Sequence, residues 1–250
     1  MSAVNATKSS PATIFLTAEW RYLAMLNYEI KPAALAAFIP AGTELDFWNA
    51  KTYVSLVGFL FQKVRVGGIS IPFHRSFEEV NLRFYVRRKA DDGWRRGVVF
   101  IKELVPRMAI AFIARKSYNE NYFAVPMAHS IEKDGEEIKS VSYFWRSNGR
   151  KGFLKVMARG HAQPLLAGSL QEFIAEHYWG YTKQRDGSTV EYRVEHPRWR
   201  AWETQVAECR CAVADLYGEN IRGLFDQPPA SSLLVDGSEV KVYRGAKLTA

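Results

Sequence analysis

Cysteine is scarce in this sequence, and long apolar runs are missing. Only Cys209 and Cys211 occur in 250 residues, which excludes a disulfide scaffold and predicts small core residues in a reducing compartment. No apolar run reaches the length of a membrane span. The first residues, MSAVNATKSSPA, lack the apolar segment of a signal peptide. We therefore expect a cytoplasmic protein without a membrane partner, with a disordered tail over residues 1–12.

The motifs of several common enzyme classes are also missing. There is no Gly-rich phosphate loop, no G-x-G-x-x-G after a strand and no G-x-S-x-G nucleophile motif. No two histidines stand at metal-ligand spacing, although ligands from distant segments would escape this test. The sequence therefore predicts no metal and no cofactor. The histidines are His74, His129, His161, His177 and His196.

Basic residues exceed acidic ones, but they are not concentrated in one segment. The chain has 34 lysines and arginines against 26 aspartates and glutamates, a formal charge of +8. A nucleic-acid-binding surface more often gathers its cations on one helix or among stacking aromatics. We expect strand-borne cations that face solvent, and nucleic acid is disfavoured as a partner. The cations in question are Arg83, Arg87, Arg88, Arg95, Arg96, Arg146, Arg150, Lys151, Arg198 and Arg200.

What the sequence does contain is a strong signal for β-strands. Residues 52–66 and 77–88 are rich in β-branched and aromatic side chains. In the second segment, Glu79, Asn81 and Arg83 share a polar face, and the residues between them form an apolar one. Ala-Asp-Asp-Gly at 90–93 predicts a hairpin to a strand at 95–105. Further strands are predicted at 138–146, 152–159, 189–196, 201–213 and 231–243.

Helical patterns are few and short. Residues 31–39 are alanine-rich with Pro32 in the first turn, residues 107–118 form a second candidate, and 169–179 begin with a capping box. No repeat or long linker divides the chain. We therefore predict one α+β, β-rich domain over residues 13–247. Its antiparallel sheet should be closed or folded over, with short helices outside it.

Four stretches together resemble a known family. They are EWRYLAMLNYEIKPAALAAFIPAGTELD at 19–46, IPFHRSFEEVNLRFYVRR at 71–88, residues 96–123 with RGVVFIKELVPR and YNENYF, and EHYWGYTKQRDGSTVEYRVEHPRW at 176–199. They are similar to the YqjF-like domain family of unknown function over nearly the whole chain. That family more distantly resembles acetoacetate decarboxylase. The resemblance implies a cone-shaped β-barrel with peripheral helices and a small enclosed pocket.

The resemblance also implies which residues would line that pocket. Acetoacetate decarboxylase holds its substrate carbonyl as a lysine imine beside a second lysine, with an arginine and a glutamate in the pocket. Counting back from Pro40 without a gap places that arginine at Arg21. The aromatic-x-Glu step Phe77-Glu78-Glu79 places the glutamate at Glu79. The lysine position is occupied by Arg107, which cannot form an imine, so the decarboxylase mechanism is not expected here.

These residues predict a pocket for a small anionic or carbonyl-bearing organic molecule. Glu79 and Arg107 are the candidate catalytic groups, and Arg21, His74 and Tyr122 the candidate binding groups. Three alternatives stay open: a lyase-like enzyme without the aligned lysine, a non-catalytic ligand carrier or sensor, and a basic nucleic-acid-binding protein. Arg21 and Glu79 could equally form a structural ion pair. The substrate, the reaction and a homo-oligomeric state are not fixed by the sequence.

Overall fold

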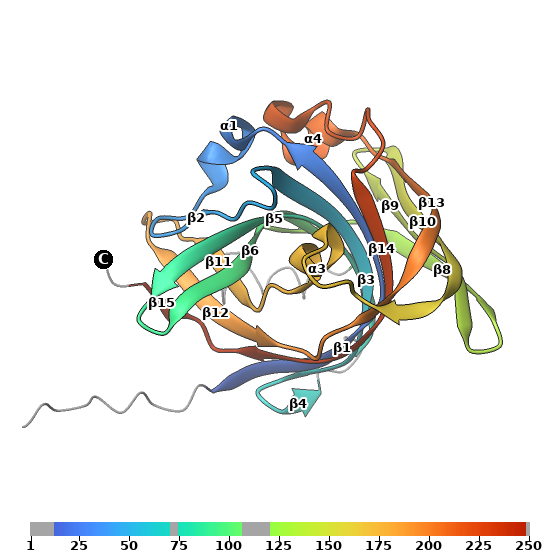
Figure 1. The fold of residues 1–250 in the computed structure, drawn as a ribbon, viewed down its shortest axis with the longest axis horizontal. Helices are drawn as coiled ribbons and strands as arrows, with labels where there is room; N and C mark the ends of the chain where they lie inside the picture. Colours follow the sequence, from blue (N-terminus) through green and yellow to red (C-terminus); the bar gives the residue numbers. More distant parts are fainter. Residues whose placement is uncertain (1–12, 71–74, 107–120, 249–250) are drawn as a thin grey trace, which may run out of the picture.

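Strands make up most of the part of the chain that the structure describes (Figure 1). The computed structural model describes residues 13–70, 75–106 and 121–248. The predicted tail, His74, Arg107 and the predicted helix at 107–118 lie outside the described residues. Among the described residues, no helix is both long and apolar enough to cross a membrane.

Strands follow one another along the chain with short helices between them. The strands are β1 (Ile14–Ile30), β2 (Glu44–Leu45), β3 (Thr52–Val66), β4 (Ile69–Ser70), β5 (Phe77–Ala90), β6 (Gly93–Val105), β7 (Tyr122–Ala124), β8 (Met127–Asp134), β9 (Glu137–Ser147), β10 (Arg150–Pro164), β11 (Trp179–Lys183), β12 (Thr189–Glu195), β13 (Arg200–Arg210), β14 (Ser231–Tyr243) and β15 (Ala246–Lys247). The helical elements are α1 (Pro32–Leu35), η1 (Ala36–Phe38), α3 (Leu170–Ala175), α4 (Val213–Tyr217) and η2 (Glu219–Ile221).

The strand-rich fold class and the predicted strands are confirmed. The β5–β6 hairpin turns between Ala90 and Gly93, and Gly93 has a φ of 120° that favours glycine. The prediction of an antiparallel sheet needs one correction, because β6 pairs in parallel with both β11 and β7. The sheet is therefore mixed, although most neighbouring strands run antiparallel.

A closed ring of strands forms the centre of the fold. Its order is β12, β11, β6, β5, β3, β1 and β14, and it closes because β12 also pairs with β14. Apolar side chains from β1, β3, β5 and β14 pack inside it. Helix α3 covers this interior with Leu170, Phe173 and Ile174, and Figure 1 shows it within the ring opening. The ring thus encloses a core of its own.

A second group of strands packs on the outside of the ring. From β14 the sheet continues through β13, β10, β9 and β8, and its apolar side chains meet the outer faces of β3 and β5. The Tyr143 hydroxyl donates a hydrogen bond to the Tyr22 carbonyl at 2.8 Å. Gly58 makes room for the Tyr143 ring, because a Cβ there would lie 2.4 Å from it. Strands β3 and β5 are therefore buried on both faces.

Several elements differ from the sequence prediction, among them the short strands β2, β4, β7, β11 and β15 and the helix α4, which were not predicted. No strand was predicted before residue 52, yet β1 spans Ile14–Ile30 at the centre of the sheet. The helix predicted at 169–179 begins as expected, because the Ser169 side chain accepts a hydrogen bond from the Glu172 amide. It ends already at Ala175. Strand β8 (Met127–Asp134) was also not predicted. Cys209 and Cys211 are free thiols that pack against the outer core, as expected.

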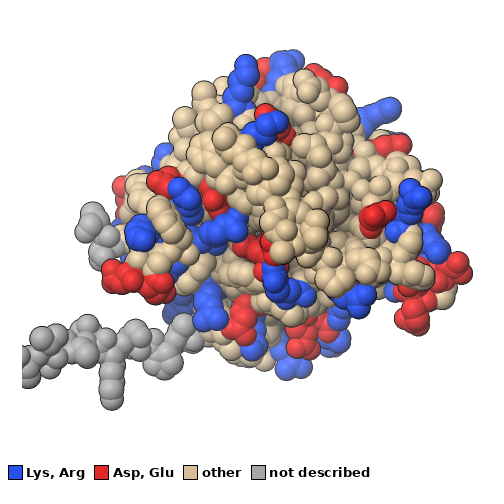
Figure 2. All heavy atoms as spheres, in the orientation of Figure 1, with Lys and Arg blue, Asp and Glu red and all other residues tan. Residues whose placement is uncertain are grey.

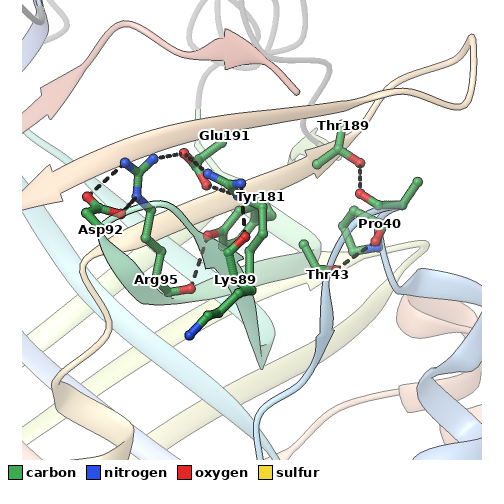
Figure 3. A network of polar contacts seen from close by, with 10 residues as sticks. Pro40, Thr43, Lys89, Asp92, Arg95, Tyr181, Thr189 and Glu191 are labelled. Carbon is green, nitrogen blue, oxygen red and sulfur yellow. Dashed lines mark hydrogen bonds and ion pairs between the residues drawn. The ribbon is translucent and has the colours of Figure 1, made fainter. Parts of the chain in front are cut away.

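Ion pairs tie the β5–β6 hairpin to β12. Glu191 is buried and accepts hydrogen bonds from Arg88 at 2.6 Å and from Arg95 at 2.5 Å. Arg95 also pairs with Asp92 in the hairpin turn, as Figure 3 shows. On the face drawn in Figure 2, basic and acidic side chains are interspersed. This pairing matches the prediction that the excess positive charge is spread out.

Candidate functional site

The interior of the ring contains a cavity of about 160 Å³. Most of the described residues that line it are apolar, and many are aromatic. A dry apolar cavity of about this size can hold a molecule as large as benzene. The rings on its wall include those of Trp20, Phe59, Phe61, Phe77, Trp179 and Trp199.

One side of the cavity carries a strip of polar side chains. Glu79, Asn81 and Arg83 follow one another on the inner face of β5, and Glu103 lies opposite Asn81 on β6. All four are buried, with exposed fractions of 9% or less. Alternation along β5 sends Val80 and the other apolar residues into the outer core. The polar face predicted from the sequence therefore faces the cavity, and the expectation that Arg83 faces solvent was wrong.

Glu79 and Tyr122, both predicted as site residues, come together here. The Tyr122 hydroxyl donates a hydrogen bond to Glu79 at 3.3 Å, and the Asn81 amide nitrogen donates another at 2.8 Å. Tyr122 reaches the site because β7 pairs in parallel with the end of β6, opposite Glu103. The Glu79 carboxylate thus accepts hydrogen bonds from two neutral donors.

Arg83 has a very different environment from Glu79. Its guanidinium Nη2 lies 3.9 Å from the Met25 sulfur. Its Nε is buried and has no hydrogen-bond partner within the described part of the chain. Nor does Arg83 form an ion pair with any described carboxylate. A buried cation in this state is costly unless something else pairs with it.

Arg21 lies outside the cavity. It pairs with Glu19 at 3.0 Å and with Asp236 at 3.3 Å, so the considered ion pair with Glu79 is not formed. Neighbouring residues on a strand point to opposite faces, and it is Trp20 that lines the cavity. The gap-free count from Pro40 does not allow for the bulge in β1, where Tyr22 has a φ of 56°.

A histidine that the sequence did not single out also lines the cavity. His177 follows the last turn of α3, and its Nε2 lies 3.2 Å from an Asp46 carboxylate oxygen. Arg96 donates to the same oxygen at 2.6 Å. Burial alone would raise the pKa of Asp46, but these two partners outweigh it and lower the pKa. Asp46 is therefore a buried carboxylate held between a histidine and an arginine.

A second histidine belongs to an aromatic stack on the far wall. The His196 ring lies 4.0 Å from that of Trp199, with 10° between their planes. Its Nδ1 is 2.9 Å from the Pro197 carbonyl. Burial lowers the pKa of His196, which favours a neutral ring. We assign this stack to the wall of the cavity.

No lysine is among the described residues that line the cavity. Lys102 precedes Glu103 on β6 and therefore faces the other side of the sheet. Its ammonium group lies 4.3 Å from the centre of the Phe123 ring, and partial burial lowers its pKa. The described residues also contain no cluster of three or more side chains able to hold a metal ion.

Solved structures with the same fold belong to acetoacetate decarboxylase-like proteins. The enduracididine biosynthesis enzyme MppR, complexed with pyruvate, aligns over 98% of this chain and 93% of its own, with a TM-score of 0.67 and 13% identity. Acetoacetate decarboxylase from Legionella pneumophila aligns over 100% and 98%, with a TM-score of 0.65 and 12% identity. At these identities the likeness shows the fold alone, and it confirms the predicted acetoacetate decarboxylase-like architecture.

Sequence relatives place the chain in a family without a known activity. The uncharacterized protein YqjF of Bacillus subtilis (strain 168) is 28% identical over 197 residues, which are 78% of this chain and 76% of that protein. The DUF2071 family model, described as an uncharacterized conserved protein, matches residues 17–239. The chain therefore belongs to the DUF2071 family and is similar to YqjF, as the resemblance in its sequence indicated.

Proposed function

We propose that the cavity binds a small organic acid, with the ligand carboxylate on the guanidinium of Arg83. The observation that carries this proposal is the state of Arg83, which is buried and has no ion-pair partner among the described residues. An arginine fork matches the two oxygens of a carboxylate. Such a ligand would supply the charge and the acceptors that Arg83 lacks.

The rest of the cavity is compatible with such a ligand. Its aromatic walls would bury an apolar body, and its volume of about 160 Å³ limits that body to a few carbon atoms. Glu79 already accepts hydrogen bonds from Asn81 and Tyr122, which stabilise its negative charge. A protein of this fold has been solved with pyruvate, a small keto acid. The free thiols support a cytoplasmic location for such a binding protein.

Binding should depend on Arg83 and not on Arg21. We expect Arg83→Met to weaken binding of a branched short-chain acid such as isovalerate by about tenfold to a hundredfold, the effect of a lost hydrogen bond to a charged group. Arg21→Met is the matched control, because Arg21 lies outside the cavity, and should bind like wild type. Isothermal titration calorimetry measures both. Equal affinities for the two variants would contradict the proposal.

Binding should occur without a covalent imine. The described lining contains no lysine, and Lys102 faces away from the cavity. We therefore expect no mass increase after incubation with an α-keto acid and sodium borohydride. Intact-mass spectrometry checks this, with Lys102→Arg prepared to locate any adduct. A stoichiometric adduct on any lysine would favour the lyase-like alternative.

A further inference from the structure

His177 is held in one orientation by the Asp46 carboxylate and by two aromatic rings that pack on it. Its Nε2 contacts Asp46 at 3.2 Å, and Asp46 is fixed by Arg96 and by a backbone bond from its own amide to the Tyr85 carbonyl at 3.0 Å. Only 1% of the His177 side chain is exposed. The rings of Tyr85 and Phe173 pack on it at 4.6 and 5.1 Å. The imidazole therefore has little freedom to turn.

This arrangement fixes which ring nitrogen of His177 carries the proton. Burial lowers the pKa of His177 to about 4, so the ring is neutral at pH 7. A neutral imidazole has one N–H donor and one acceptor nitrogen. The Asp46 carboxylate can only accept, so Nε2 carries the proton and Nδ1 is the acceptor. Within the part of the chain that the structure describes, Nδ1 is buried and has no hydrogen-bond partner.

The unpaired Nδ1 of His177 and the guanidinium of Arg83 belong to residues that line the same cavity and adjoin the same aromatic ring. Tyr85 adjoins both, because the Arg83 guanidinium carbon is 6.0 Å and the His177 ring 4.6 Å from the centre of its ring. The charge of Arg83 is also one of the causes that lower the pKa of His177. A second acceptor, the Asn81 amide oxygen, is buried and has no partner among the described residues. The cavity thus offers the guanidinium of Arg83 as a donor, and His177 Nδ1 and the Asn81 amide oxygen as acceptors without a partner among the described residues.

We propose that His177 Nδ1 accepts a hydrogen bond from a hydroxyl group of the ligand, so that the site selects α-hydroxy acids over the matching α-keto and unsubstituted acids. The inference rests on the proposed function, since Arg83 must hold the carboxylate that places the hydroxyl. A keto oxygen is itself an acceptor and would face the Nδ1 lone pair. Sites that hydrogen-bond a hydroxyl group reject analogues lacking it, because buried polar groups are then left unpaired.

Three ligands with one carbon skeleton test this selection. Isothermal titration calorimetry would compare α-hydroxyisovalerate, α-ketoisovalerate and isovalerate at pH 7. The wild-type protein is expected to bind the hydroxy acid about tenfold more tightly than the other two, the usual effect of one neutral hydrogen bond. Equal binding of all three acids by wild type would overturn the selection by His177 and leave the proposed function standing.

Two substitutions separate a tautomer-dependent role from a structural one. His177→Phe keeps an aromatic ring at this position but removes the acceptor nitrogen Nδ1. Binding of isovalerate should therefore persist, and the preference for the α-hydroxy acid should disappear. Asp46→Asn can donate to Nε2, which would move the histidine proton to Nδ1 and shift the preference toward the keto acid. Retention of the hydroxyl preference in both variants would overturn the inference.

The same experiment tells this inference apart from the proposed function. Arg83→Met is expected to weaken all three ligands together, because it removes the partner of the carboxylate that they share. His161→Gln is the matched histidine control, since 78% of that side chain is exposed, and it should behave like wild type. If wild type binds none of the three acids, or if Arg83→Met binds them unchanged, the proposed function fails and this inference fails with it.

Discussion

Replacing Gly237 with alanine is expected to lower the free energy of unfolding by about 4 kcal/mol, which combines an overpacking cost with a strained backbone. Gly237 lies on β14 opposite Arg21 of β1 and has a φ of 96°. A Cβ at this position would lie 1.9 Å from the Trp20 carbonyl oxygen and 2.8 Å from the Leu23 side chain. The carbonyl belongs to a paired strand, so it cannot move aside without breaking the sheet.

Gly135 provides the control for backbone strain alone. It has a φ of 59° in the turn between β8 and β9, and a Cβ added there would meet no other atom within 4 Å. Gly135→Ala should therefore cost only about 1 kcal/mol. Urea denaturation of both variants gives the comparison. Equal losses would mean that the close approach of β14 to β1 is not what requires glycine at 237.

Gly237→Ala should change the shape of the cavity as well as lower the stability of the protein. Trp20 and Leu23, the two residues that the new methyl group would strike, both line the cavity. They flank the bulge at Tyr22, where β1 changes its pairing with β3. The Gly237→Ala protein that still folds should therefore also bind the proposed organic acid more weakly than Gly135→Ala does.

The strands were largely predictable, but the ring was not. Alternating apolar residues and the turn at 90–93 define β5 and β6 locally, which is why their hairpin was found. Ring closure depends on the pairing of β12 with β14, which brings Val194 next to Val242. No local pattern specifies that contact. Strand β1 was missed because its residues 18–30 mix apolar, charged and polar residues without regular alternation.

The site was predictable only in part, for related reasons. Glu79 was predicted through a family resemblance and Tyr122 from the polar cluster at 119–122, and both line the cavity. Alternation along β5 separated Arg83 from the apolar face, but it could not tell that the polar face lies inside a closed ring while the apolar face packs in the outer core. The position of His177 on the cavity wall was not predicted, because the sequence was equally compatible with a continuous helix to residue 179. A polar face within a strand that lies between long apolar strands is the signal that could have pointed to Asn81 and Arg83.

Acidification should destabilise the protein by about 3 kcal/mol between pH 6.5 and pH 4 through His177 alone. Burial lowers its pKa from the ordinary 6.5 to about 4, so the unfolded chain takes up a proton in this range that the folded protein does not. Each pH unit in that interval costs about 1.4 kcal/mol. The stabilisation is complete above pH 6.5 and is lost as the pH falls toward 4.

The pH dependence of urea denaturation distinguishes His177 from the other acid-sensitive groups. Asp46 also has a lowered pKa, but its stabilisation is lost only below its ordinary value of 3.8, outside this interval. His177→Phe should therefore make the stability curve less steep between pH 6.5 and pH 4, leaving the slope that comes from His196, whose pKa burial also lowers. The control His161→Gln should keep the full slope. A curve for His177→Phe as steep as that of wild type would mean that His177 is not held neutral by burial. The neutral, hydrogen-bond-accepting ring that the proposed hydroxyl selection requires would then be absent too.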